Sequence, residues 1–184
     1  MNRTKQAKAC QNTATTFLPA HAMFKTQVIY VRLQPERIRM RYLPCGAEID
    51  SPPLMAIDQR SGKPVILAVG DEAQKIGASI ARVNVVNPFA HPRMLISDFT
   101  LADALLRHFF RQVLKDRSLW SLTPRIVMHP DFTPEGGFTQ VELRAMREIC
   151  LAMGATRNTG WQGRPLEDAE LLAGKLPADG VKLW

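Results

Sequence analysis

The sequence predicts an α/β fold, and the order of its elements carries this prediction. The first half contains short apolar runs of strand length, separated by turn signals. The second half contains two helices with a clear 3.6-residue apolar period, and a short buried run follows each of them. Strands followed by alternating helices and strands are typical of an α/β domain.

Four apolar runs predict strands in the first half of the chain. They lie at residues 29–33, 38–40, 54–58 and 64–69. The first two alternate apolar and polar residues and flank a tight turn around Pro35, so they are expected to form a hairpin with one buried face on each strand. Further on, Asp71 is expected to cap a short helix that Gly77 ends, and residues 81–87 are expected to be extended.

Two helices, at residues 98–115 and 139–154, dominate the second half. The apolar side chains of the first helix fall on one stripe, as in a helix that packs on a core: Phe99, Ala102, Leu105, Leu106, Phe109, Phe110 and Val113. Thr139 and Glu142 form a capping-box pattern at the start of the second helix. The remaining predicted elements are strands at 125–129 and 156–161 and a short helix at 165–174.

The composition is that of an ordinary globular chain. Its 184 residues are 46% apolar and 22% charged. No apolar run reaches the ~20 residues that a membrane helix needs, so we expect a cytoplasmic location. The three cysteines are widely spaced and form no Cys-x-x-Cys pair, which predicts neither a disulfide framework nor a metal site.

The net charge of +7 is concentrated near the N-terminus. Residues 1–25 carry four of the 24 basic residues and no acid, which leaves 20 basic against 17 acidic residues in the remainder. This distribution predicts a basic, disordered arm over residues 1–25, with Met23 as a candidate natural start. An arm of this kind favours weak attraction to anionic surfaces over specific reading of a nucleic acid.

Seven phrases link this sequence to a known family. They are Ser-Pro-Pro-Leu-Met-Ala-Ile-Asp at 51–58, Ala-Val-Gly-Asp-Glu-Ala at 68–73, Val-Asn-Pro-Phe at 86–89, Ile-Ser-Asp-Phe at 96–99, Pro-Arg-Ile-Val at 124–127, Thr-Gln-Val-Glu-Leu-Arg-Ala at 139–145 and Met-Gly-Ala-Thr at 153–156. In order and spacing the chain resembles the first half of the rod-shape-determining bacterial actins, the MreB family. The resemblance implies an actin/Hsp70-type, ribonuclease H-like domain I over residues 26–174, with a mixed sheet, flanking helices and a small subdomain. Residues 175–184 would then form a C-terminal tail.

The resemblance also implies that the nucleotide motifs of the family are degenerate here. The family's first phosphate motif, Asp-Leu-Gly-Thr, aligns with four residues of the hairpin: Arg32, Leu33, Gln34 and Pro35. An arginine replaces the acid that organises the metal, and a proline has neither the N–H nor the hydroxyl that would face a phosphate. The family's Glu-Glu-Pro aligns with Gly163, Arg164 and Pro165. A pseudo-ATPase that uses no cofactor and no metal is therefore expected.

Two further features have competing interpretations. Glu142 matches a family acid thought to help position the attacking water, but its place in a helix cap is sufficient to explain it and is the preferred interpretation. Leu119, Trp120 and Leu122 lie where the family carries a small apolar loop that dips into the membrane face. They predict either reversible contact with the inner membrane or a partner, or closure of the domain's own core.

The preferred hypothesis is a non-catalytic actin-like domain that acts by contact with another protein, with a bacterial actin or a second copy as the candidate partner. Cell shape, the envelope and stress responses are the processes that the resemblance implies. The tail at 175–184 is expected to fold back, with Trp184 covering a surface that a second domain covers in the family. The alternative is a small enzyme that uses His129, Asp131 and Glu142, or a phosphate-binding protein that uses Arg32 and Arg164.

Overall fold

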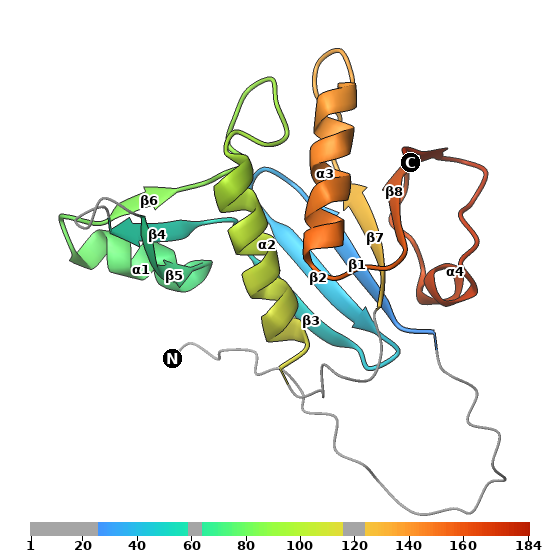
Figure 1. Ribbon diagram of the computed structural model, residues 1–184, viewed down its shortest axis with the longest axis horizontal. Helices are drawn as coiled ribbons and strands as arrows, with labels where there is room; N and C mark the ends of the chain where they lie inside the picture. The colour runs from blue at the N-terminus through green and yellow to red at the C-terminus, as the bar shows by residue number, and fades with distance from the viewer. Residues whose placement is uncertain (1–25, 59–63, 116–123) are drawn as a thin grey trace, which may run out of the picture.

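A six-stranded mixed sheet forms the centre of the molecule (Figure 1). The computed structural model describes residues 26–58, 64–115 and 124–184. The strand order is β3-β2-β1-β7-β8-β9. The bounds of these strands, in that order, are Ala47–Ser51, Ile38–Leu43, Val28–Leu33, Arg125–Pro130, Asn158–Gln162 and Val181–Lys182. Strands β1, β7 and β8 are parallel, whereas β2, β3 and β9 are antiparallel to their neighbours.

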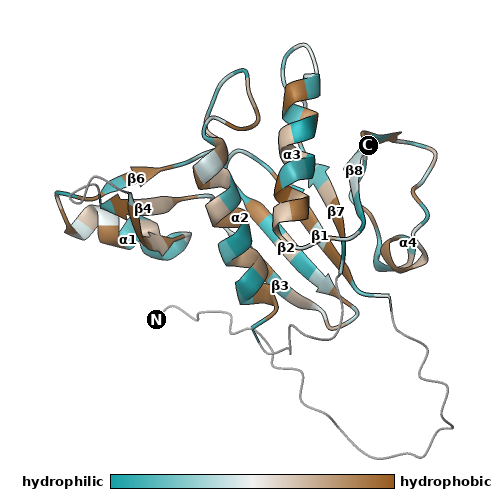
Figure 2. Ribbon diagram, in the orientation of Figure 1, coloured by the Kyte–Doolittle hydropathy of each residue, from teal (hydrophilic) through white to brown (hydrophobic). Residues whose placement is uncertain are grey.

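The central strand β1 is buried on both faces, which explains its nearly continuous apolar sequence. One face contributes Ile29, Val31 and Leu33 to the main core. Helices α2 (Phe99–Val113) and α3 (Gln140–Ala152) cover this face with the apolar sides that Figure 2 shows in brown. The opposite face forms a second, smaller core around Val28 and Tyr30.

A small subdomain projects from the sheet at the left of Figure 1. It contains a three-stranded sheet in the order β5-β4-β6 and the helix α1. The bounds of these elements are Val65–Val69, Met55–Asp58, Asn84–Val86 and Asp71–Ser79. The expected domain architecture, a main sheet with flanking helices and a small subdomain, is therefore present.

The C-terminal tail is part of the main sheet. Helix α4 (Asp168–Ala173) lies on the second core, and β9 then pairs with β8. The Trp184 ring packs against the main core over Gly160, where an added Cβ would lie 2.3 Å from it, and its indole N–H donates to Asn158 at 2.7 Å. The expected fold-back is thus present, but residues 175–184 do not form a tail separate from the domain.

Local expectations were wrong at several element ends. Gly70 rather than Asp71 occupies the cap position of α1, and that helix continues through Gly77 to Ser79, because its terminus is held by packing on the small sheet. The last helix begins at Asp168 rather than near Pro165, since Glu167 and Glu170 form its capping box. Strands β3 and β9 were not predicted, as neither contains a strong apolar run.

The other predicted elements agree with the structure within a few residues. Asp98 caps α2 by accepting from Leu101 N–H, and Thr139 and Glu142 form the predicted capping box of α3. None of the helices in the described ranges combines the length and apolarity that crossing a bilayer requires.

Candidate functional site

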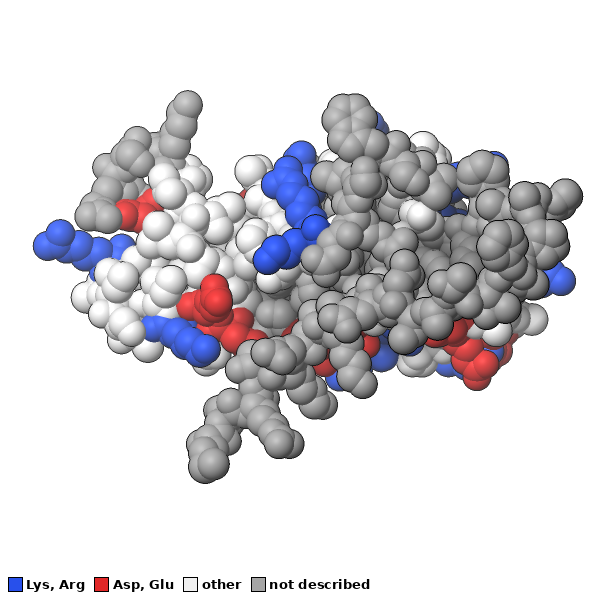
Figure 3. Space-filling model, turned by 90° about the horizontal axis from the view of Figure 1, so that it is seen from below, with Lys and Arg blue, Asp and Glu red and all other residues white. Residues whose placement is uncertain are grey.

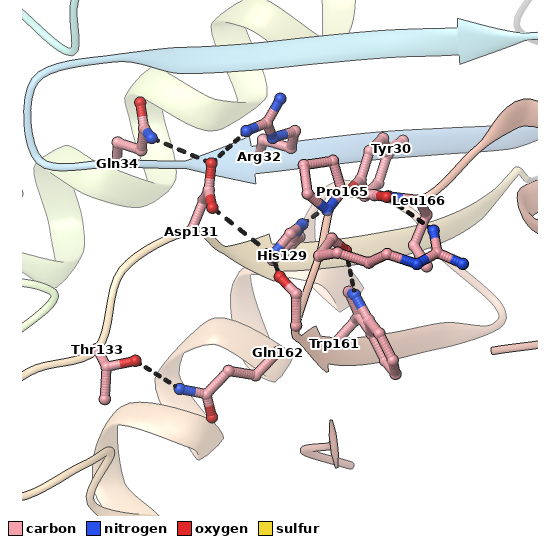
Figure 4. Close-up of polar contacts among 12 residues, drawn as sticks. Tyr30, Arg32, Gln34, His129, Asp131, Thr133, Trp161, Gln162, Pro165 and Leu166 are labelled. Carbon is pink, nitrogen blue, oxygen red and sulfur yellow. Dashed lines mark hydrogen bonds and ion pairs between the residues drawn. The ribbon is translucent and has the colours of Figure 1, made fainter. Parts of the chain in front are cut away.

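Several residues that the sequence analysis singled out lie at the carboxyl ends of the three parallel strands. Arg32 belongs to the end of β1, His129 belongs to the end of β7, and Asp131 follows β7 directly, while Tyr30 lies in the middle of β1. Open α/β sheets bind their ligands at this edge. Figure 4 shows that the side chains of Arg32 and Gln34 point toward Asp131, which lies beside His129. Together with the segment that follows β8, these residues form a group that we call the edge network: Tyr30, Arg32, Gln34, His129, Asp131, Gly163 and Arg164.

A buried histidine forms the centre of the edge network. His129 is 1% exposed, its Nδ1 lies 2.6 Å from the Tyr30 hydroxyl, and its Nε2 lies 3.1 Å from the Gly163 carbonyl oxygen. The carbonyl only accepts, so Nε2 carries the hydrogen and Nδ1 accepts from Tyr30. The Tyr30 oxygen in turn accepts from Leu166 N–H at 3.0 Å. Every polar atom of this histidine is thereby used when it is neutral.

The titration behaviour of the pair agrees with this arrangement. Burial is the main cause that lowers the pKa of His129, while Asp131 acts in the opposite direction. Burial is also the main cause that raises the pKa of Tyr30. A neutral histidine that accepts from a protonated tyrosine is therefore the stable state near neutral pH.

The β1–β2 turn is closed by its own hydrogen bonds. Gln34 N–H donates to Arg37 O at 2.9 Å, and Arg37 N–H donates back to Gln34 O at 3.3 Å. Arg32 pairs with Asp131 Oδ2, and Gln34 Nε2 donates to the same oxygen at 3.0 Å. The Pro35 carbonyl accepts from the Asn87 side chain at 2.8 Å, so the turn is also tied to the small subdomain.

Arg164 is engaged on the outer side of the same edge. Its guanidinium donates to both carboxylate oxygens of Glu170, at 3.0 and 2.5 Å, and to Asp179 at 3.1 Å. The hydrogen bonds that Arg164 donates to Glu170 are the main cause that raises the pKa of Arg164. Both arginines that were predicted to bind an anion, Arg32 and Arg164, therefore already pair with carboxylates of this chain.

Position 163 has no room for a side chain. A Cβ there would lie 2.7 Å from the Trp161 ring and 3.1 Å from the backbone of Gly180. The Trp161 indole N–H donates to the Arg164 carbonyl at 2.9 Å and holds this segment in place. The backbone at Gly163 therefore packs closely on a buried tryptophan.

Glu142 makes its contacts away from the edge network. Its carboxylate accepts from Leu95 N–H at 2.8 Å and from the N–H and hydroxyl of Thr139 at 2.8 and 2.7 Å. Burial alone would raise its pKa, but these three hydrogen bonds outweigh burial and lower it. The helix-cap interpretation thus accounts for its contacts with Thr139, and the bond from Leu95 N–H comes from outside the cap. The predicted trio is incomplete: His129 Nε2 and Asp131 Oδ1 are 3.9 Å apart, while Glu142 bonds elsewhere.

Comparison with known proteins identifies the family. Residues 42–159, more than half of the chain, match the family described as MreB/Mbl protein. This chain belongs to the MreB/Mbl family. It is 34% identical over 113 residues to the cell shape-determining protein MreB of Escherichia coli K12, and 30% identical over 110 residues to the cell shape-determining protein Mbl of Bacillus subtilis 168. These matches cover 60% and 59% of this chain but only 30% of each relative.

Solved structures agree with the MreB/Mbl assignment at the level of the fold. The structure of MreB5 of Spiroplasma citri bound to ADP has a TM-score of 0.57 at 20% identity, and the match covers 73% of this chain and 37% of that one. A MamK double helical filament has a TM-score of 0.53 at 12% identity, over 72% of this chain and 40% of that one. The fold is therefore actin-like, as the sequence predicted.

The MreB/Mbl match covers only part of the candidate site residues. His129, Asp131 and Glu142 lie within the matched residues, whereas Arg32 to Pro35 precede them and Gly163 and Arg164 follow them. The candidate membrane residues Leu119, Trp120 and Leu122, and the arm at 1–25, lie outside the described residues. Within the described ranges, no group of three or more His, Cys, Asp or Glu side chains is placed to hold a metal ion.

The sequence did not identify Tyr30, Trp161 or Asp179 as parts of this site. Tyr30 looks like an ordinary core residue in an apolar strand, and only its hydroxyl, which meets residues about one hundred positions away, gives it a further role. The glycines at 160 and 163 on either side of Trp161 were the local signal in the sequence that another group packs closely on this segment.

Proposed function

We propose that this chain is a non-catalytic member of the MreB/Mbl family that acts by binding another actin-like chain. The chain spans about 30% of the length of its curated relatives. The observation that supports a non-catalytic role is the edge network, because the polar groups at the carboxyl ends of the parallel strands bond to one another.

The edge network is a poor match for a magnesium–nucleotide. Arg32 occupies the position of a metal-organising acid, and its charge is neutralised by Asp131. A phosphate loop offers free backbone N–H groups, whereas the N–H groups of Gln34 and Arg37 bond across the turn and Pro35 has none. Binding a phosphate here would require breaking the Arg32–Asp131 pair and opening the turn, both of which oppose binding.

The small subdomain supplies a surface suited to protein contact. Strand β5 is an edge strand, and its successive residues Val65, Ile66 and Leu67 are 46%, 42% and 44% exposed. In Figure 3 the left part of the molecule, where the small subdomain lies, shows a white, uncharged area with Lys, Arg, Asp and Glu side chains around it. An exposed apolar edge strand favours pairing with a strand of another chain. Since MamK forms a double helical filament, an actin-like partner or a second copy is the preferred occupant.

Nucleotide titration tests the non-catalytic part of the proposal. Isothermal titration of the full chain with magnesium ATP should give no saturable binding, because Arg32 is paired with Asp131 and the N–H groups of Gln34 and Arg37 bond across the turn. MreB5 of Spiroplasma citri, whose structure contains AMPPNP, serves as the positive control under the same conditions. Micromolar, magnesium-dependent binding of ATP by this chain would reject the proposal.

Partner binding is tested separately at β5. The full chain should co-sediment with Escherichia coli MreB filaments or self-associate in light scattering, and Ile66→Lys should abolish the association. Val141→Lys is the matched control, because Val141 is 77% exposed on α3, away from the small subdomain. Equal association of wild type and Ile66→Lys would exclude β5 as the contact.

The location of the chain follows from the same proposal. An actin-like partner implies a cytoplasmic location and a place in cell-shape or envelope processes. Contact with the inner membrane through Leu119, Trp120 and Leu122, and a link to stress responses, stay predictions from the sequence. Vesicle co-sedimentation of wild type and Trp120→Ser would test the membrane contact, which predicts a loss in the variant.

A further inference from the structure

A cavity lies on the second core, away from the edge network. Its volume is about 240 Å³, and it opens between α4 and the face of β7 and β8 opposite to α2 and α3. The side chains of Val127, Leu171 and Leu176 line its apolar part. Val127 and Leu171 are almost fully buried, so the floor of the cavity is fixed by the packing of the second core.

The polar part of the cavity carries an uncompensated positive charge. Arg125 lines the cavity, donates from Nη2 to the Leu171 carbonyl, and has a buried Nε without a partner. In the part of the chain that the structure describes, no carboxylate pairs with Arg125. Burial is the main cause that lowers its pKa, and Arg157 adds to the effect. A bound anion would offset both the burial of the Arg125 charge and its repulsion by Arg157.

The remaining charged groups of the cavity do not neutralise Arg125. Glu170 also lines the cavity, but its two oxygens accept from Arg164 and from Glu167 N–H. Lys182 on β9 adds a second cation at the exposed rim. The excess of positive charge therefore remains at the side of the cavity where Arg125 lies.

Local structure keeps the guanidinium in place. Arg125 is the first residue of β7, and Gly174 ends α4 in the left-handed conformation with φ 70°. A Cβ at Gly174 would lie 2.4 Å from Arg125 Nη1, so the glycine leaves the space that the arginine occupies. The Leu171 carbonyl at the end of α4 then fixes one side of the guanidinium fork.

We propose that this cavity binds a small carboxylate with a short apolar chain. The carboxylate would bind Arg125, with Lys182 at the rim, and the chain would contact Val127, Leu171 and Leu176. The volume corresponds to that of about eight water molecules and lies below the roughly 300 Å³ at which ordinary ligand sites begin. The cavity is thus too small for a nucleotide but large enough for a short-chain acid.

A ligand series tests the proposal on the full chain. Binding is followed by amide chemical shifts at constant ionic strength with acetate, hexanoate, hexanol and inorganic phosphate. Hexanoate should bind saturably, and acetate, hexanol and phosphate should each bind at least about tenfold more weakly, because each lacks the chain or the carboxylate. Absence of hexanoate binding, or phosphate binding of equal strength, would overturn the proposal.

Variants locate the site. Arg125→Met keeps the apolar stem and removes the charge, so hexanoate should bind at least about tenfold more weakly. Arg147→Met makes the same change on an exposed position of α3 and should bind like wild type. Lys182→Met, at the exposed rim, should reduce affinity a few fold and serves if Arg125→Met fails to fold. Unchanged affinity in a folded Arg125→Met, or in Lys182→Met if that variant serves instead, would refute the proposal.

Discussion

Removing one hydroxyl group should measure how much the edge network contributes to stability. Tyr30→Phe keeps the ring in the second core but deletes the oxygen that accepts from Leu166 N–H and donates to His129 Nδ1. Tyr30 is 3% exposed, so water does not replace the lost partner without rearrangement. The variant therefore leaves one buried donor and one buried acceptor unsatisfied.

The expected cost follows from these two groups. Each buried polar group left without a partner costs about 1–3 kcal/mol, so the free energy of unfolding should fall by about 2–6 kcal/mol. For a chain of this size, each kcal/mol corresponds to about 2–4 °C in the unfolding midpoint, which gives a decrease of about 4–24 °C. The volume of the core is nearly unchanged, so no cavity contribution is expected.

Urea and thermal unfolding, followed by far-ultraviolet circular dichroism, provide the measurement. Ser79→Ala is the control, because its exposed hydroxyl donates to Lys75 O at 2.9 Å and its loss should cost less than about 0.5 kcal/mol. If Tyr30→Phe costs no more than Ser79→Ala, the two hydrogen bonds do not contribute as the structure implies, and the edge network would not stabilise a closed site.

Three further predictions concern other parts of the molecule. Burial lowers the pKa of His129 below its unfolded value of about 6.5, so the stability that neutral His129 contributes is present above that pH and is lost as the pH falls toward the folded-state pKa. Between about pH 7.5 and pH 5 the free energy of unfolding of wild type should therefore fall more than that of His129→Gln. Equal pH dependence of the two proteins would contradict this prediction. The pKa of Glu142 is also lowered by folding, so the stability that its carboxylate contributes is present above the unfolded pKa and is lost as the pH falls through the folded pKa. Glu142→Gln should therefore cost about 1–2 kcal/mol at neutral pH and progressively less in acid. Gly160→Ala should cost about 1–3 kcal/mol through contact with the Trp184 ring, and this cost should shrink in the background of Trp184→Ala; additive costs in that double-mutant cycle would show that the two residues do not touch.

Local signals predicted much of the fold. Alternation over 29–33 and 38–40 gave the hairpin of β1 and β2, and the pattern at Thr139 and Glu142 gave the cap of α3. These features depend on residues within a few positions of one another, so the sequence contains all the information that they need. By contrast, β3 and β9 were missed because their pairing partners, rather than their own composition, make them strands.

The candidate site was predicted only in part. The sequence singled out Arg32–Pro35 and the pair at Gly163 and Arg164, and as an alternative it predicted that the two arginines bind an anion. Their carboxylate partners come from distant positions: Asp131 lies 99 residues from Arg32. Arg164 reaches Asp179 through the return of the chain toward β9.

The sequence by itself determined the family and the order of the main elements, because these are properties of residue identity and short-range periodicity. Only the tertiary structure decided that the nucleotide edge is closed by its own hydrogen bonds and that Arg125 lacks a counter-charge. Both depend on which side chains the parallel strands bring together. Hydrogen bonds and ion pairs act over a few ångströms of space, whatever the separation along the chain.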